Sequence, residues 1–151
     1  MNHAFLTPDS TVEKLLSTNV RGTFNVSREA AKLMRTAKRG RIVNISSIAV
    51  PLRLDGQAAY VAAKAAVERM SQVLAQEFGP FGITVNVVGP TPIDTDMTRG
   101  VPKEKMKALV NRFAIRRMGT FDDVANVVDF FLRAESDAVT GQVIYLGGVP
   151  N

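Results

Sequence analysis

The chain has 151 residues, a length typical of one domain with a substantial buried core. Its 46% hydrophobic and 22% charged residues are the composition of a folded globular protein, not of a disordered one. The chain has no cysteine and one histidine, His3, beside the amino terminus. This composition excludes disulfides and thiolate metal sites and argues against a histidine-based triad, so we predict no metal site.

The net charge of +5 is modest, and the basic residues gather in two groups, at 35–41 and 99–117. Only Phe113 is interleaved as an aromatic, so these groups indicate solvated surface rather than a nucleic-acid site. An acidic, phosphate-bearing carrier or cofactor is the weaker alternative. No apolar run reaches the ~18–20 residues of a membrane span, and the start lacks the pattern of a signal peptide. We expect a cytoplasmic protein that binds neither nucleic acid nor a membrane.

Helical spacing of apolar residues predicts a long helix over residues 10–38, which ends in a basic turn before Gly40. The β-branched run at 41–46 then predicts a strand. A loop rich in turn formers leads to a second helix over 58–78, whose small residues would let another helix approach closely. Residues 83–88 predict the next strand.

The last third of the chain begins with an irregular segment, 93–119, that contains one short helix at 103–111. Thr120 has the position of a helix N-cap, with Asp123 three residues on as its reciprocal partner. An amphipathic helix follows, and residues 141–146 predict a final strand. Strands that are separated by helix-length crossovers run parallel, with helices packed on the faces of the sheet.

Tyr60 and Lys64 are separated by four residues, which places both side chains on one face of the second helix. The pair alone is a weak signal, since a partly exposed helix surface would show it as well. Tyrosine has a pKa of ~10 in water, and a nearby ammonium favours the phenolate, which makes such a ring a usable general acid or base. Ser47 stands at the end of the first strand, where a parallel sheet places its ligands.

Four runs of sequence form a recognisable series. Residues 40–47 are Gly-Arg-Ile-Val-Asn-Ile-Ser-Ser, and residues 59–64 are Ala-Tyr-Val-Ala-Ala-Lys. Residues 82–90 are Gly-Ile-Thr-Val-Asn-Val-Val-Gly-Pro, and residues 93–98 are Ile-Asp-Thr-Asp-Met-Thr. In this order they resemble the short-chain dehydrogenase/reductase family, and most of all its 3-oxoacyl-(acyl carrier protein) reductases. The resemblance covers nearly the whole chain. It implies a partial Rossmann-like, doubly wound α/β fold, with three parallel strands and flanking helices in a single domain over 1–151.

The resemblance also implies a reaction, the NAD(P)-dependent reduction of a carbonyl or oxidation of an alcohol. In that reaction Tyr60 would exchange a proton with the substrate oxygen, and Ser47 would hydrogen-bond to the same oxygen. Lys64 would bind the nicotinamide ribose hydroxyls. Asn19 would support a water-mediated proton relay, and an amide on its otherwise apolar stripe is an independent sign, because a buried amide needs partners. We interpret Ser46 as structural.

The resemblance places contacts to NADP or NAD at Tyr60, Lys64, Pro90, Ile93 and Thr95. One departure lies beside them, since Thr91 stands where the family usually has glycine. Glycine allows close approach of the backbone to the cofactor and a permissive φ. The β-branched threonine therefore predicts an altered loop and an altered fit to the cofactor.

The glycine-rich turn that cradles the pyrophosphate in this family is absent from the sequence, as are the residues that choose between NAD and NADP. We therefore expect a truncated member without the first nucleotide-binding half, with weak cofactor binding and little turnover alone. Two alternatives stay open: a catalytically silent fragment, and an assembly partner whose second chain supplies the missing half.

The predicted strand at 41–46 would have a bare, apolar edge, which is a template for pairing with another chain. Helices 10–38 and 58–78 have apolar and alanine-rich faces that form a dimer contact in the resembling family. We therefore expect a homo-oligomer through these two helices. The substrate would be a small carbonyl or alcohol that the sequence does not identify, bound between apolar walls from 50–57 and 100–117.

Overall fold

The computed structural model describes residues 3–149. Its helices and strands are, in chain order, α1 (Asp9–Leu15), α2 (Gly22–Ala37), β1 (Gly40–Ile45), α3 (Ala49–Leu52), α4 (Ala58–Phe78), β2 (Ile83–Gly89), α5 (Asp96–Arg99), α6 (Lys103–Val110), α7 (Phe121–Leu132) and β3 (Val143–Tyr145). A π-helical turn, Leu16–Arg21, joins α1 to α2. Three short 3-10 turns complete the secondary structure, at Ala4–Leu6, Gly79–Phe81 and Ala134–Ser136.

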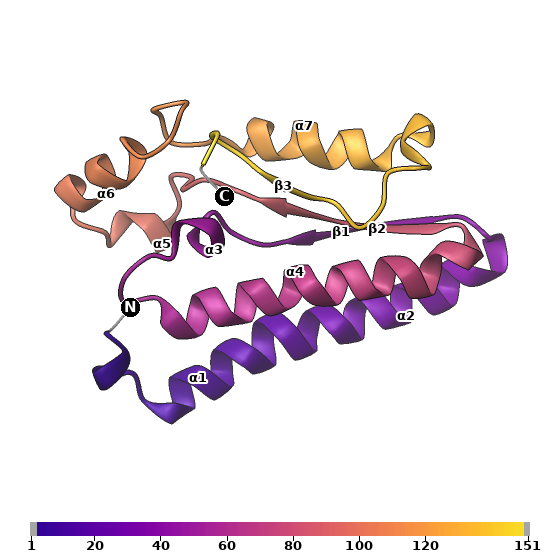
Figure 1. The fold of residues 1–151 in the computed structure, drawn as a ribbon, viewed down its shortest axis with the longest axis horizontal. Coiled ribbons are helices and arrows are strands. Elements are labelled where there is room, and N and C mark those ends of the chain that lie inside the picture. The colour runs from indigo at the N-terminus through magenta and orange to yellow at the C-terminus, as the bar shows by residue number, and fades with distance from the viewer. Residues whose placement is uncertain (1–2, 150–151) are drawn as a thin grey trace.

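The three strands form one parallel sheet in the order β1-β2-β3. The register pairs Gly40 with Ile83 at one end of the sheet, and Gly89 with Tyr145 at the other. Helices α2 and α4 lie side by side on one face of the sheet, and α7 covers the other face (Figure 1). The predicted α/β class, with three parallel strands and flanking helices, is confirmed.

The layers are held together by apolar side chains from both sides of the sheet. One buried cluster joins α2 and α4 to the sheet through Ala31, Ile42, Leu74, Ala75, Ile83 and Val85. On the opposite face, Phe131 of α7 is fully buried. Every residue of β2 is buried, as expected for a central strand with helices on both faces, whereas Ile45 at the end of β1 is 43% exposed.

The helix predicted over 10–38 is not uniform, because its middle is π-helical. The Gly22 N–H donates to the carbonyl of Ser17, five residues back, and the Asn19 side chain donates to the Leu15 carbonyl at 3.0 Å. A π-helical turn adds one residue to the helix between successive backbone hydrogen bonds, so the apolar stripe changes direction there.

Further corrections concern the two loops beside the sheet. The segment interpreted as a plain loop before α4 contains α3, because Ile48 and Leu52 are both buried against Phe113. The irregular segment after β2 contains α5 as well as the predicted α6. The last strand is shorter than predicted, three residues from Val143 to Tyr145.

Other predictions of local structure are confirmed. Helix α4 has the predicted bounds, and the 3-10 turn at Gly79–Phe81 follows it. At the start of α7, the Asp123 N–H donates to the Thr120 hydroxyl at 3.2 Å, and the Thr120 N–H donates to the Asp123 carboxylate at 2.8 Å. Within residues 3–149, no helix combines the length and apolarity that a membrane crossing requires.

Candidate active site

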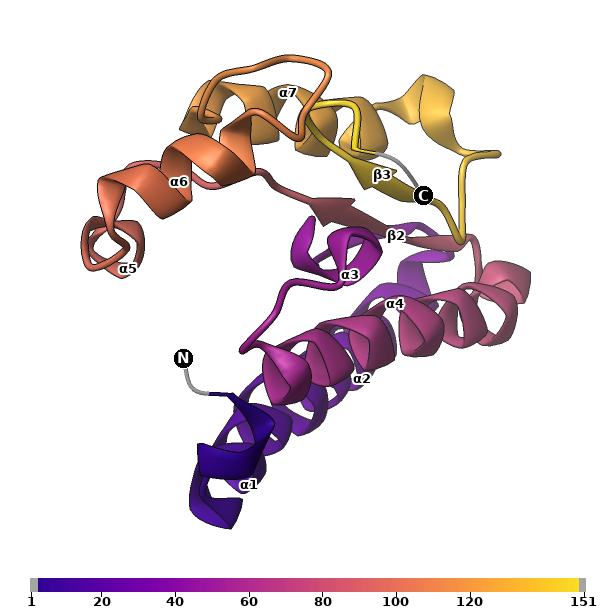
Figure 2. The same ribbon diagram turned by 60° about the vertical axis from the view of Figure 1, so that its left-hand side comes forward.

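A cavity of about 320 Å³ lies at the carboxyl ends of β1 and β2. Figure 2 shows α5 and α6 beyond the end of β2, with α3 beside that end, where the loops after parallel strands gather. Six of the seven candidate site residues line this cavity: Ser47, Tyr60, Lys64, Pro90, Ile93 and Thr95. The segments expected to supply apolar walls contribute Leu54, Val101, Met106 and Leu109.

Lys64 is held in place by the end of β1. Its Nζ donates a hydrogen bond to the Ile45 carbonyl at 3.0 Å and lies 5.9 Å from the centre of the Tyr60 ring. Burial lowers the pKa of the Lys64 ammonium from its usual range. A lysine ammonium has three N–H donors, and the Ile45 bond uses one. No other residue among 3–149 accepts from this ammonium, so its remaining donors can bind hydroxyl groups of a ligand.

The hydroxyl groups of Ser47 and Tyr60 remain able to hydrogen-bond a ligand. Ser47 Oγ accepts a bond from the Ala49 N–H at 3.1 Å, which ties the residue to the start of α3 while its own O–H can still donate. The Tyr60 hydroxyl has no hydrogen-bond partner among residues 3–149. The cavity thus presents the Ser47 and Tyr60 hydroxyls and the Lys64 ammonium between walls that are largely apolar.

The loop after β2 is fixed by one threonine hydroxyl. Thr98 Oγ1 donates to the Ile93 carbonyl at 2.7 Å and accepts from the Thr95 N–H at 3.0 Å. A parallel bridge joins Ile93 to Gly119, and the Gly119 N–H donates to the Pro92 carbonyl at 2.9 Å. These bonds hold Ile93 and Thr95 at the cavity wall.

Thr91 does not force the loop into a strained backbone. Its φ is not positive, and its side chain is 6% exposed, between Gly119 and Gly147. A Cβ at Gly119 would lie 2.4 Å from Thr91 Oγ1, and one at Gly147 would lie 2.6 Å from Thr91 Cγ2. Two glycines therefore accommodate the larger side chain that stands where the family usually has glycine.

Asn19 is the one candidate that does not line the cavity. It lies in the π-helical turn, which packs against α4, and its side-chain amide donates to the Leu15 carbonyl of its own helix. Asn19 therefore lies outside the cavity lining, and its place in a proton relay stays a prediction.

Two polar residues beside the cavity were missed in the sequence, Glu68 and Tyr145. The Tyr145 hydroxyl donates to Glu68 Oε1 at 2.7 Å, and the Ser46 hydroxyl donates to the same oxygen. Burial, and then the bond to the Glu68 carboxylate, raises the pKa of Tyr145. One sequence signal could have revealed Glu68, because it lies four positions after Lys64 on the helix face that also carries Tyr60.

A nicotinamide cofactor fits the donors of this site. Within residues 3–149, Lys64 keeps N–H donors free and the Tyr60 hydroxyl has no partner, and Pro90, Ile93 and Thr95 line the same cavity. The volume of about 320 Å³ lies at the lower end of the ~300–1,000 Å³ usual for ligand sites. The residues described here would hold the nicotinamide end, which is only part of a dinucleotide.

Comparison with known proteins agrees with this arrangement. Residues 2–148 match the model of a family described as Enoyl-(Acyl carrier protein) reductase. The chain belongs to the short-chain dehydrogenase/reductase family. The sequence resemblance is therefore confirmed, and the parallel sheet with helices on both faces is the corresponding part of a Rossmann-like fold.

Individual relatives show how much of the family fold is present. The chain is 34% identical to the 3-oxoacyl-(acyl-carrier-protein) reductase FabG of Pseudomonas aeruginosa, over 98% of this chain and 63% of the relative. It is 39% identical to a short-chain type dehydrogenase/reductase of Picea abies, over 94% and 53%. The chain thus spans between about half and two thirds of the length of these relatives.

Proposed function

We propose that this chain carries the proton-transfer site of an oxidoreductase that interconverts a carbonyl and an alcohol. The observation that carries the proposal is the shared cavity of Ser47, Tyr60 and Lys64. Family membership supports it, as do relatives that are named 3-oxoacyl-(acyl-carrier-protein) reductases. A nicotinamide cofactor, when bound, supplies or takes up the hydride at the substrate carbon.

The chain's own residues would handle the substrate oxygen. In the direction of reduction, the Tyr60 hydroxyl donates its proton to that oxygen as it becomes an alcohol. The Ser47 hydroxyl hydrogen-bonds to the same oxygen and stabilises the developing negative charge. Lys64 binds hydroxyl groups of the ribose and places a positive charge beside the tyrosine. The apolar walls exclude water from the reacting atoms.

The cofactor would be NADP or NAD, and this chain alone would bind it weakly. The cavity would hold the nicotinamide and its ribose only. We therefore expect a Kd above ~1 mM, which corresponds to less than about 4 kcal/mol of binding energy. Remote contacts are what position a reacting group, so we expect little turnover by the chain alone. The cytoplasmic setting expected from the sequence remains a prediction.

Saturation-transfer NMR with NADPH and NADH tests this proposal. We expect saturation transfer to the nicotinamide and ribose protons rather than to the adenine protons. This transfer should be lost in Lys64→Gln. It should be kept in the control Lys107→Gln, which changes an exposed lysine of α6. No transfer to nicotinamide at millimolar cofactor would contradict the proposed site. Micromolar affinity, or contacts through adenine, would contradict weak binding through the nicotinamide end.

We also propose a homo-oligomer through α1, α2 and α4. An open hollow of about 1,050 Å³ runs along these helices and the π-helical turn, and it includes Leu16, Phe24 and Met70. Leu16 and Phe24 are 42% and 38% exposed, so this hollow presents apolar surface that a second copy of the chain could cover. Light scattering tests the proposal: a mass of 16.4 kDa at micromolar concentration, that of one chain, would contradict it.

A further inference from the structure

Glu68 is a carboxylate in the interior of the protein. It is 8% exposed, and it lies on α4 one turn after Lys64 and two turns after Tyr60. No salt bridge to Glu68 is formed among residues 3–149. A buried carboxylate is costly unless hydrogen-bond donors replace the water that it loses. Two hydroxyls do so here, those of Ser46 and Tyr145, and both donate to Oε1.

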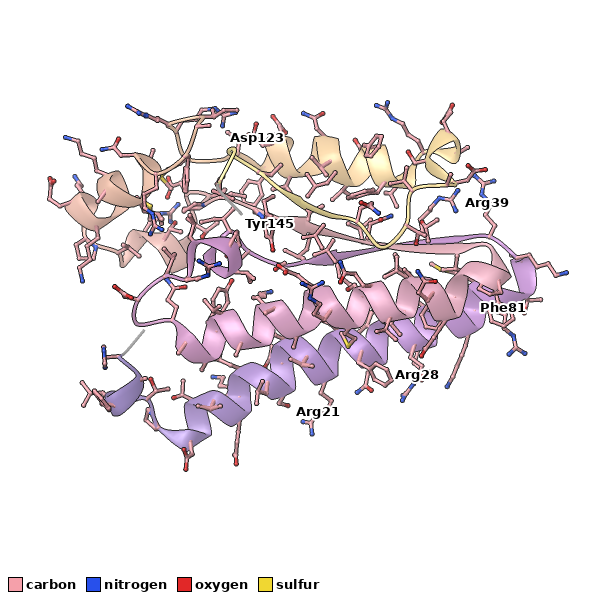
Figure 3. The ribbon with its side chains drawn as sticks, viewed as in Figure 1. Arg21, Arg28, Arg39, Phe81, Asp123 and Tyr145 are labelled. Atoms are coloured by element: carbon pink, nitrogen blue, oxygen red, sulfur yellow. The ribbon has the colours of Figure 1, made fainter. Side chains whose placement is uncertain are left out.

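The two donors come from strands that are not neighbours. Ser46 directly follows β1, and Tyr145 is the last residue of β3, with β2 between them. The Tyr145 ring crosses the end of β2 at Gly89, where a Cβ would lie 2.3 Å from the ring. Figure 3 shows Tyr145 toward the carboxyl end of the sheet, with Arg39 and Phe81 at the opposite end. Glu68 therefore joins the ends of both outer strands to α4.

Ser46 lies between two residues of the candidate site. The carbonyl of Ile45, one residue before it, accepts the bond from Lys64 Nζ at 3.0 Å. Ser47, one residue after it, presents its hydroxyl to the cavity. The Ser46 N–H donates to the Val88 carbonyl at 2.7 Å, so its backbone is tied to β2 while its side chain is tied to Glu68. Displacement of Ser46 would move both neighbours.

We propose that Glu68 is a positioning residue of the candidate active site, which acts through Ser46 and Tyr145. Its carboxylate fixes the end of β1, so that the Ile45 carbonyl holds Lys64 and Ser47 faces the cavity. This role rests on the proposed function, since it assigns Glu68 to the same site. This role does not depend on a bound cofactor, because the series of contacts that connects Glu68 to Lys64 is formed by described residues alone.

The test is the pKa of Lys64, measured by NMR titration of its side-chain carbon and proton signals in the full chain. In Glu68→Leu we expect Lys64 to lose its fixed acceptor and move toward solvent, so its pKa rises toward the ordinary ~10.4. Glu68→Gln keeps an oxygen acceptor for both hydroxyls and should leave the pKa near that of the wild type. If Glu68→Leu does not fold, Tyr145→Phe removes one donor and should shift the pKa upward by less.

The matched control is Ser71→Ala. Ser71 is fully buried on α4 and accepts a bond from Asn44 of β1 at 2.9 Å, so this variant also breaks a contact between α4 and β1, away from the cavity. It should leave the Lys64 pKa unchanged.

Three results would overturn the proposal. A fall in the Lys64 pKa in Glu68→Leu would mean that Glu68 acts only as a nearby negative charge, whose loss disfavours the ammonium. An unchanged Lys64 pKa in Glu68→Leu, as expected in Ser71→Ala, would mean that Glu68 serves packing alone. If Glu68→Leu does not fold, an unchanged Lys64 pKa in Tyr145→Phe would mean the same. None of these results depends on turnover or on cofactor binding, so failure here is distinguishable from failure of the proposed function.

Discussion

The two halves of α4 have different surroundings although they belong to one regular helix. In the amino-terminal half, Tyr60 and Lys64 are half-buried and line the cavity of the candidate active site. In the carboxyl-terminal half, Leu74 and Ala75 are 3% and 2% exposed and pack in the apolar cluster with α2 and the sheet. Glu68 lies between the two halves.

This difference follows from how the helix crosses the sheet. The carboxyl-terminal half covers the strands, where β1 and β2 supply apolar side chains, and the amino-terminal half extends past the strand ends, where loops and α3 replace them (Figure 1). The carboxyl-terminal half therefore contributes most of the packing that stabilises the fold. The amino-terminal half has room for partly solvated polar side chains such as Tyr60 and Lys64. Substitutions in the two halves should have separable effects on activity and on stability.

The largest expected effect is the loss of activity in Tyr60→Phe, in the amino-terminal half. Removal of a general acid typically costs ~100–10,000-fold in turnover, whereas the ring itself and its packing are retained. We expect this loss in whichever assembly of the protein shows carbonyl reduction, followed by nicotinamide absorbance, with an unchanged thermal midpoint. Arg69→Gln, at an exposed position of the same helix, is the control and should keep both values.

In the carboxyl-terminal half, Leu74→Ala should destabilise the fold by about 2–5 kcal/mol. The leucine is buried in the cluster of α2, α4 and the sheet, so its truncation leaves a cavity. Chemical denaturation measures the effect. Val73→Ala is the matched control, since Val73 is 56% exposed and should change stability by no more than about 0.5 kcal/mol. Equal effects of the two variants would remove the distinction between the halves.

Ser71→Ala should cost about 1–3 kcal/mol, because it leaves the buried Asn44 amide without its acceptor. Ser71 Oγ accepts from Asn44 Nδ2 at 2.9 Å and donates to the Val67 carbonyl at 2.7 Å. The same denaturation experiment checks this value, with Gln76→Ala at an exposed position of α4 as control. A neutral result would show that water replaces the serine hydroxyl.

The smallest expected effect is a pH dependence of stability that comes from Lys64. Burial lowers its pKa in the folded state, so between that pKa and the unfolded value of ~10.4 the unfolded chain binds more protons. The stability of the wild type should therefore rise with pH in this window relative to Lys64→Met. The rise should be modest, because Lys64 is only half-buried and solvent screens it.

Thermal midpoints measured between pH 7 and pH 10 check this dependence. Lys107→Met, at an exposed position of α6, should follow the wild type across the same range. If the difference in thermal midpoint between the wild type and Lys64→Met stays constant with pH, the prediction is wrong. Lys64 would then be fully hydrated in the folded protein.

The sequence determined the three strands, the longer helices and their order. The bounds of α4 follow from apolar periodicity and from Gly79 and Pro80 after it, and the start of α7 follows from Thr120 and Asp123. These signals are reliable because helical contacts and caps join residues within about four positions of one another. The Tyr60–Lys64 pair was found for the same reason.

Only the tertiary structure decided the rest of the site. The bond between Tyr145 and Glu68 joins residues 77 positions apart, and the place of Thr91 depends on two glycines, Gly119 and Gly147, that come later in the chain. Such contacts depend on the order and register of strands, which no local pattern of residues specifies. The π-helical turn at Asn19 is also invisible to periodicity, since one inserted residue shifts the apolar stripe without interrupting it.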